Sequence, residues 1–231
     1  MEVIENTPMK LVLRVPAKAP LLNAIRRSIN EIKTLAFDEV EIFKNDSALY
    51  DEFLAHRIGL VPLKSENAMN DKTEIACKLV KKGPGMVLSG DFEGNLEMVH
   101  KDIPLTLLEN EQEVEIIATA RLGKGVEHEK YSPGLCYYRN LFVVDAKNSQ
   151  IEAIVNGSRG SIKPEKQKDG WLCDLSESVI NEIEKIDSKA VADSDEMIFV
   201  IESFGQMSAK EILLKSIKAL NENVVSFEKS L

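Results

Sequence analysis

Apolar positions near the start of the chain follow first a strand period and then a helix period. Between Met9 and Val15 every second residue is apolar, which is typical of a strand with one buried face. Pro20 can begin a helix, because the first turn does not need its missing N–H. From Leu22 to Ile32 apolar residues follow at steps of three and four, which predicts a helix with one apolar face. A second strand is predicted over 36–43.

The following segment predicts a short helix and then β structure. Ser47 is a candidate N-cap for the helix, Gly59 suits the left-handed position at its end, and Pro62 prevents the helix from resuming. Between Lys81 and Tyr138 the chain contains Gly-Pro-Gly turns and short apolar runs, and residues 114–121 alternate between apolar and polar. This part of the chain is therefore predicted to be rich in β-strands.

Towards its end the chain returns to the pattern of its beginning. Residues 146–170 are polar and rich in glycine and lysine, which predicts a loop or a weak subdomain. Residues 174–186 resemble a short amphipathic helix. The unbroken apolar run 197–201 is short enough for a buried strand, and Gly205 turns the chain after it.

The last helix is predicted to carry a wider apolar band than one contact with a sheet requires. Ser208 and Glu211 form a capping box at its start. Leaving a Leu or Ile side chain in water instead of burying it forgoes roughly 1.5–3 kcal/mol, so the band favours a second covering surface. A fully buried core helix fits the same pattern. Periodicity alone does not distinguish such a helix from one that binds a partner. The main stripe is formed by Ala209, Leu213, Ile217, Leu220 and Val224, with Ile212 and Leu214 beside it.

Composition and charge narrow the class of protein. Of 231 residues, 44% are hydrophobic and 29% charged, so the chain can fold around one or two cores. Its 29 Lys and Arg against 38 Asp and Glu give a formal net charge of −9, which excludes a generally basic nucleic-acid coat. We find no apolar stretch of the ~18–20 residues that a membrane helix needs and no secretory signal at the start, and we expect a cytoplasmic protein.

The cysteines and histidines form no local metal or redox motif. No two cysteines stand in a CxxC pair, and no histidine spacing suggests metal ligands. Buried free thiols in a reducing compartment fit this pattern. A Cys/His nucleophilic pair formed by the fold stays open, and with it an alternative function as a stand-alone thiol or metal hydrolase. These residues are Cys77, Cys136, Cys173, His56, His100 and His128.

Several ordered blocks of the sequence resemble one family. The first blocks are Asn23–Arg27, Thr34–Ile42 and Asp51–Leu63, the last with the motif His-Arg-Ile-Gly-Leu-Val-Pro-Leu. Later blocks are Gly83-Pro84, Ser89–Asp91, Ala120–Gly125, Glu127-His128, Ser132-Pro133 and Val200–Gly205. The series resembles the alpha-like, third-largest subunit of multisubunit DNA-directed RNA polymerase, and most of all the archaeal form of that subunit.

This resemblance implies an α+β fold in which both chain ends share a domain. Residues 1–43 and 192–231 would build one discontinuous dimerisation domain, with a β-rich insert domain over 44–145. Residues 146–191 would be a degenerate, cluster-free remnant of a ferredoxin-like subdomain. In that family the first and last helices pack against their counterparts in a small partner, called subunit L in archaea. The partner-binding residues implied on these helices are Leu22, Ile25, Ile29, Ile32, Ala209, Leu213, Ile217, Leu220 and Val224.

The resemblance also implies contacts with the large catalytic subunits. Arg26 and Arg27 lie on the polar side of the first helix, where two forked donors can bind acidic groups or carbonyl oxygens. Glu52, His56 and Arg57 either make subunit contacts or only stabilise the short helix and its final turn.

In one segment the sequence departs from the family. Some archaeal members hold an iron–sulfur cluster in the ferredoxin-like subdomain, and such clusters need roughly four thiolates. Residues 146–195 contain only Cys173. We therefore expect no cofactor, and a small packed unit kept by Trp171 and the 174–186 helix.

Together these observations predict a non-catalytic assembly subunit that pairs with subunit L and forms the platform for the catalytic subunits in transcription. The polymerase reaction needs carboxylates that hold Mg²⁺, and the nearest pattern, Asp193-x-Asp195, is expected in a solvated linker. Direct sequence-specific nucleic-acid binding is not expected, because the chain is acidic and only 6% aromatic. No metal site and no membrane contact are predicted.

Overall fold

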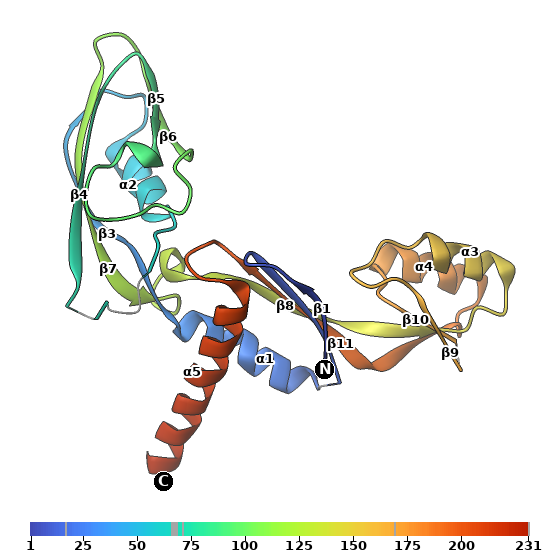
Figure 1. Cartoon of the computed structure of the whole chain (residues 1–231). Coiled ribbons are helices and arrows are strands. Elements are labelled where there is room, and N and C mark those ends of the chain that lie inside the picture. Colours follow the sequence, from blue (N-terminus) through green and yellow to red (C-terminus); the bar gives the residue numbers. More distant parts are fainter. Residues whose placement is uncertain (17, 66–68, 71, 169, 231) are drawn as a thin grey trace.

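The computed structural model describes residues 1–16, 18–65, 69–70, 72–168 and 170–230. Figure 1 shows an upright β-rich body, a central sheet with helices α1 and α5, and a small distal unit. In chain order the helices and strands are β1 (Glu2–Asn6), β2 (Lys10–Val15), α1 (Ala19–Ser28), β3 (Lys33–Asn45), α2 (Asp51–Gly59), β4 (Glu74–Lys82), β5 (Gly85–Leu88), β6 (Pro104–Leu108), β7 (Glu113–Lys124), β8 (Gly134–Val144), α3 (Ser149–Gly157), β9 (Glu165–Gln167), β10 (Gly170–Cys173), α4 (Glu177–Ile186), β11 (Val191–Ser203) and α5 (Ala209–Ser230).

The central sheet joins the two ends of the chain. Its strand order is β1-β2-β11-β8-β10-β9, and neighbouring strands are antiparallel. Val12 on β2 stands opposite Val200 on β11. Side chains of β2, β11, α1 and α5 share one buried apolar cluster that includes Leu13, Ile29 and Phe199. The two helices therefore cover one face of this sheet.

The first helix is shorter than its pattern predicts. Regular α-helix stops at Ser28, and a 3₁₀ turn spans Ile29–Glu31. Ile32 is already extended, and β3 begins at the next residue. The apolar steps of three continue because a 3₁₀ turn has three residues per turn, so Ile29 and Ile32 still face the core.

The upright body is the β-rich module. Its sheet has the order β3-β7-β4, and the β5–β6 hairpin and α2 pack beside it. The alternation over 114–121 gives β7 its buried positions, and Ala118 stands opposite Val40 of β3. The rings of Phe37 and Phe92 lie 5.1 Å apart in its core. The prediction of β structure in this part of the chain is confirmed.

Two details predicted for the short helix are wrong. Ser47 does not cap it: its N–H and hydroxyl donate to the Asn45 side-chain oxygen (3.1 and 2.7 Å), and α2 begins at Asp51. Gly59 is not left-handed, because it is itself the last residue of α2, and Leu60 after it stays right-handed with φ −87° and ψ 0°. The helix therefore begins later than the pattern predicts and includes the glycine.

The strand pairing moves two of the expected domain boundaries. β3 starts at Lys33 and pairs with β7, so the insert begins before residue 44. β8 lies inside the expected 44–145 insert, but it pairs with β11 from Gly134 to Val144 in the central sheet. By strand pairing, the upright body extends from β3 to β7, and β8 belongs to the central sheet.

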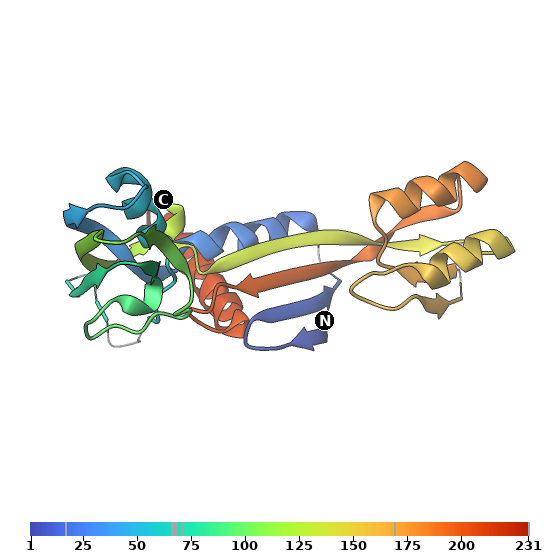
Figure 2. The same ribbon diagram turned by 90° about the horizontal axis from the view of Figure 1, so that it is seen from above.

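The distal unit is packed rather than a loop. Figure 2 shows β8 and β11 running out of the central sheet as a ribbon that carries it. Its cluster joins Val155 of α3, Ile183 of α4 and Cys173 of β10. Within the segment 146–170, Asn148 caps α3 by accepting the N–H of Gln150 at 2.9 Å. Strand β11 begins at Val191, so Asp193-x-Asp195 lies in a strand and not in the predicted linker.

Candidate subunit interface

The start of α5 is built as the sequence predicts. Gly205 turns the chain with φ +97°, a conformation that favours glycine. The N–H of Ser208 donates to the Glu211 carboxylate (2.9 Å), and the N–H of Glu211 donates to the Ser208 hydroxyl (3.3 Å). The first of these bonds lowers the pKa of Glu211, because it stabilises the charged carboxylate. The capping box is confirmed.

The two halves of α5 have different surroundings. In the first half Ala209, Ile212 and Ser216 are buried against the sheet and α1. From 221 to 230 every residue is exposed, and Figure 1 shows this half projecting away from the body. An apolar face on a projecting half-helix has no covering surface within the described chain.

The exposed apolar side chains of α5 continue its stripe. Ile217 is 44% exposed, Val224 57% and Phe227 66%. Leu213 and Leu220 are half-buried. These five residues follow at steps of four, three, four and three, which is the spacing of a seam between two helices. We define the α5 apolar surface as Leu213, Leu214, Ile217, Leu220, Val224, Val225 and Phe227.

Four residues expected to bind the partner lie in the chain's own core. Leu22, Ile29 and Ile32 of the first helical segment are 4%, 1% and 5% exposed, and Ala209 is fully buried. They pack against β2 and β11, which leaves almost no surface for a second polypeptide. We therefore remove them from the predicted interface, while Ile25, half-buried beside the same cluster, stays in it.

Phe227 and Val225 are interface candidates that the sequence analysis does not name. The predicted stripe ends at Val224, although a further step of three reaches Phe227. Leu21 of α1 is likewise 54% exposed. The signal for Phe227 is present in the spacing, whereas the exposure of Leu21 is visible only in the fold.

The arginine pair lies on the open side of α1. Arg26 and Arg27 are both exposed. Two nitrogens of Arg26 donate to the Asn23 side-chain oxygen (3.3 and 2.9 Å), which holds the guanidinium along the helix. This position leaves both side chains accessible, and their role in contacting a large subunit stays a prediction.

On α2 the three predicted residues have different surroundings. Arg57 donates through Nε to the carbonyl of Leu105 (2.9 Å) and through a second nitrogen to that of Pro104. It thereby ties α2 to β6, which favours a stabilising role for this residue. Glu52 and His56 are exposed on the helix, and their part in subunit contacts stays a prediction.

The surroundings of the cysteines disfavour the thiolate form that nucleophilic chemistry needs. Burial raises the pKa of Cys136 to about 12, although the charge of Arg26 acts in the opposite direction, and burial raises the pKa of Cys173 to about 11. Burial also raises the pKa of Cys77. A thiolate is the reactive form, so these surroundings do not support a thiol hydrolase. In the described part of the chain no three His, Cys, Asp or Glu side chains are grouped to hold a metal ion.

Comparison with known proteins finds a matching family model, whose range includes β8 as well as most of the upright body. Residues 40–149 match the family described as the RNA polymerase Rpb3/RpoA insert domain. The DNA-directed RNA polymerase subunit Rpo3 of Pyrococcus horikoshii is 32% identical over 223 residues, which cover 86% of this chain and 84% of the relative. Rpo3 of Methanothermobacter thermautotrophicus is 32% identical over 255 residues and covers 96% of both chains. The chain belongs to the archaeal Rpo3 family.

Family membership confirms the resemblance that the ordered blocks indicated. Rpo3 of Methanocaldococcus jannaschii is also 32% identical, over 93% of this chain and 87% of the relative. The Rpo3 match spans the central sheet as well as the β-rich module, because these alignments extend well beyond 40–149. Among the helices that the structure describes, none has the length and apolar character needed to cross a membrane.

Proposed function

We propose that this chain is a non-catalytic assembly subunit of an archaeal DNA-directed RNA polymerase. It pairs with the small subunit L through the α5 apolar surface, and the pair forms a platform for the large catalytic subunits in transcription. The observation that carries the proposal is the row of exposed apolar side chains along α5, from Ile217 to Phe227. Arg26 and Arg27 are the proposed contacts to a large subunit.

The energetics favour an obligate partner. Each large apolar side chain left in water forgoes roughly 1.5–3 kcal/mol of burial, and the α5 apolar surface holds several of them. Obligate interfaces are large and apolar, like a domain core cut in half. The dimerisation domain proposed here combines β1, β2 and α1 with β11 and α5, so both chain ends support the same surface.

We assign the catalytic step of transcription to a partner. Carboxylates that hold Mg²⁺ for nucleotidyl transfer must converge on one point. Asp193 and Asp195 are exposed on β11, and Asp193 accepts a hydrogen bond from the amide of Asn140 (3.2 Å). Their surroundings are those of a solvated strand.

The distal unit is proposed to be stable without an iron–sulfur cluster. Its one cysteine, Cys173, is buried in the apolar cluster. The carboxylate of Asp174, 3% exposed, accepts two bonds from Arg139 (2.7 and 2.5 Å) and the N–H of Ser161 (2.5 Å). This ion pair raises the pKa of Arg139 and holds the segment before β9. The purified protein should show no visible absorption near ~400 nm and no bound iron; either signal would contradict this part of the proposal.

Co-expression with a subunit L candidate tests the interface. Val224→Asp places a carboxylate in an apolar seam, which costs several kcal/mol on binding. We expect at least a ~100-fold loss of affinity for subunit L, measured by co-purification and titration calorimetry. Val224 is 57% exposed in this chain, so the substitution should leave its own fold intact.

The matched control is Val80→Asp, which changes an equally apolar residue, 48% exposed, on β4 of the upright body and away from α5. It should bind subunit L like the wild type. Leu213→Asp should also fail to co-purify, but Leu213 is half-buried, so its result is interpreted only with the circular dichroism spectrum of the variant. Equal recovery of Val224→Asp and wild type would remove α5 from the interface.

A further inference from the structure

Two adjoining hollows lie where the upright body meets the central sheet. The larger, about 440 Å³, is lined by Leu60 and Pro62 after α2 and by Phe204 after β11. The smaller, about 310 Å³, is lined by Leu96 and Met207 among others. Met9 and Gln206 line both hollows, so they stand between them. We call the two hollows together the corner groove.

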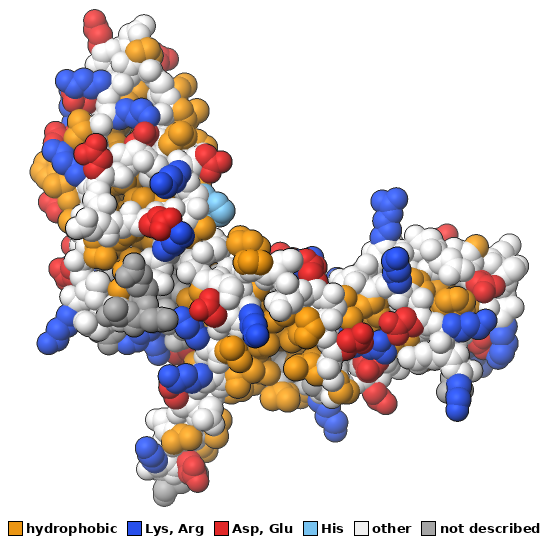
Figure 3. Space-filling view, viewed as in Figure 1, with side chains coloured by type: hydrophobic (Ala, Val, Ile, Leu, Met, Phe, Trp, Pro, Cys, Tyr) orange, Lys and Arg blue, Asp and Glu red, His pale blue; other side chains and the backbone are white. Residues whose placement is uncertain are grey.

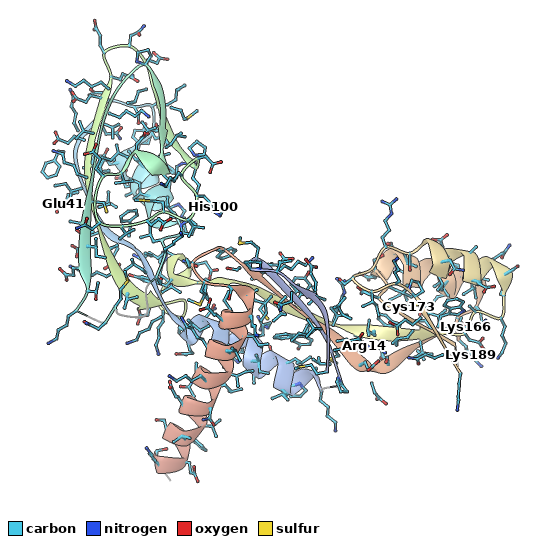
Figure 4. All side chains as sticks on the ribbon, viewed as in Figure 1. Arg14, Glu41, His100, Lys166, Cys173 and Lys189 are labelled. Atoms are coloured by element: carbon cyan, nitrogen blue, oxygen red, sulfur yellow. The ribbon has the colours of Figure 1, made fainter. Side chains whose placement is uncertain are left out.

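The corner groove presents exposed apolar side chains among polar ones. Met9, Leu60 and Phe204 come from three separate segments and are 45%, 47% and 42% exposed. Figure 4 places His100, which also lines the larger hollow, on the side of the body that faces the central sheet. Figure 3 shows hydrophobic side chains at the surface in this corner. The groove is separate from the outer half of α5, which projects in another direction.

The two lysines that line the groove already have partners. Lys130 is paired with Asp38 (2.6 Å), and Lys64 with Glu97 (2.5 Å). Their charges are therefore compensated, and these two lysines leave no unpaired cation for an anionic ligand. The exposed apolar lining suits an occupant with apolar side chains, and the Glu129 carboxylate at the larger hollow disfavours an anionic one.

Gln206 is a polar group that lacks a partner in this apolar setting. It is 6% exposed, and its side-chain oxygen is buried without a hydrogen-bond donor among the described residues. Native structures rarely leave a buried acceptor unpaired. Because Gln206 stands between the two hollows, a donor placed there, after a small rotation of the amide, would complete its hydrogen bonding.

The loop that carries Gln206 is held in place. The N–H of Phe204 donates to the Pro133 carbonyl (3.1 Å), and that of Gly205 to the Ser203 hydroxyl (2.8 Å). A Cβ on Gly205 would lie 2.4 Å from the Val99 side chain, so the close approach requires glycine. This wall of the groove is therefore pre-formed, which lowers the entropy cost of binding.

We propose that the corner groove receives an extended segment of another polymerase subunit. An extended chain places side chains i and i+2 on one side, so two apolar side chains can fill the two hollows. The backbone N–H between them is then the donor that Gln206 lacks. This inference rests on the proposed function, because it takes the occupant from the assembled polymerase.

Photo-crosslinking in the purified, assembled polymerase tests the occupant. We would replace Phe204 by p-benzoylphenylalanine, irradiate the complex and identify the crosslinked peptide by mass spectrometry. We expect one segment of another subunit, crosslinked also from position 60. Crosslinks confined to this chain, crosslinks to a second copy of it, or none at all would overturn the proposal.

Gln206→Leu separates recognition from folding. Removing the unpaired oxygen should leave the urea midpoint of the free chain unchanged or raised, while the crosslinking yield from position 204 falls at least tenfold. A lower midpoint with an unchanged yield would show that Gln206 is structural and would overturn its assigned role.

The two interfaces can fail independently. Gln206→Leu should still bind subunit L, and Val224→Asp should not. If Val224→Asp keeps subunit L while position 204 crosslinks to another subunit, the α5 proposal fails and the corner groove stands. If Val224→Asp loses subunit L and position 204 yields no crosslink to another subunit, only the corner groove fails.

Discussion

Asp38 on β3 is the centre of a small charged cluster at the base of the upright body. It accepts hydrogen bonds from Lys130 (2.6 Å) and from the Tyr131 hydroxyl (2.9 Å), and Arg121 lies 3.4 Å away. The Lys130 bond, with smaller help from Tyr131 and Arg121, lowers the pKa of Asp38. Burial and the neighbouring carboxylate raise the pKa of Tyr131. Single side chains here join segments that lie about 90 residues apart in the sequence.

The lowered pKa of Asp38 predicts a pH dependence of stability. A carboxylate with a folded pKa below its unfolded value, near 3.8, stabilises the fold above that value, and the contribution is lost as the pH falls through the folded pKa. Asp38→Asn should therefore cost about 1 kcal/mol at pH 7, a modest figure because the side chain is 31% exposed.

Urea unfolding of both proteins between pH 7 and pH 2 measures this difference. The difference in unfolding free energy between the wild type and Asp38→Asn should shrink below pH 4 and vanish near pH 2. As a control, Asp145→Asn removes a pair with Lys147, whose side chain is 89% exposed, and it should change stability little at any pH. A difference for Asp38→Asn that persists unchanged at pH 2 would show that its carboxylate charge is not responsible.

At the scale of elements, α5 is one helix with two environments. Its first half is fixed by the capping box and by packing against the sheet and α1. Its second half is held mainly by its own helical hydrogen bonds, because 221–230 are exposed throughout. A helical segment this short gains little stability from propensity alone, so we expect a bound partner to increase its order.

Hydrogen exchange should report this difference between the two halves. In the free chain the amides of 221–230 should exchange much faster than those of 210–217, since opening the outer half exposes little buried surface. Binding of subunit L should slow exchange over 221–230 by at least about 100-fold. Equal protection of both halves in the free chain would contradict the assignment of the outer half as uncovered.

At the scale of the whole molecule, the chain is an open arrangement of three bodies and not a closed globule. Figure 2 shows the upright body and the distal unit at opposite ends of the central sheet. The central sheet that supports α5 contains strands from both chain ends. The interface helix is therefore positioned only when the chain has folded as a whole. Each body nonetheless has its own apolar cluster.

The isolated chain should self-associate through the uncovered helix. Its average mass in sedimentation should exceed 25.8 kDa and rise with concentration, because apolar α5 surfaces bind each other when subunit L is absent. The double variant Ile217→Asp with Val224→Asp should sediment as a monomer. Self-association that persists in this variant, but disappears with Phe204→Asp, would assign it to the corner groove instead.

Much of the fold is readable from local patterns. The strand near Met9–Val15, the alternation over 114–121 and the capping box at Ser208 each depend on residues a few positions apart, and all three are present. The errors arise where the structure depends on residues that lie outside such a short stretch of sequence. A cap at Ser47 and a loop over 146–170 are wrong, because the turn at Asn45 and the packing of α3 on α4 involve neighbours that a short pattern does not contain. The alternative prediction for 146–170, a small subdomain, agrees with the structure.

The sequence by itself determined the period of each element, the acidic charge and the family. Only the tertiary structure decided which apolar residues of a stripe are core and which are surface: Ala209 is enclosed, and Val224 on the same stripe is open. The physical reason is that the apolar period determines the side of a helix on which a residue lies. Its burial depends on whether segments distant in the sequence pack over that part of the helix. The same reason explains the corner groove, since Met9, Leu60 and Gln206 become neighbours only through the fold.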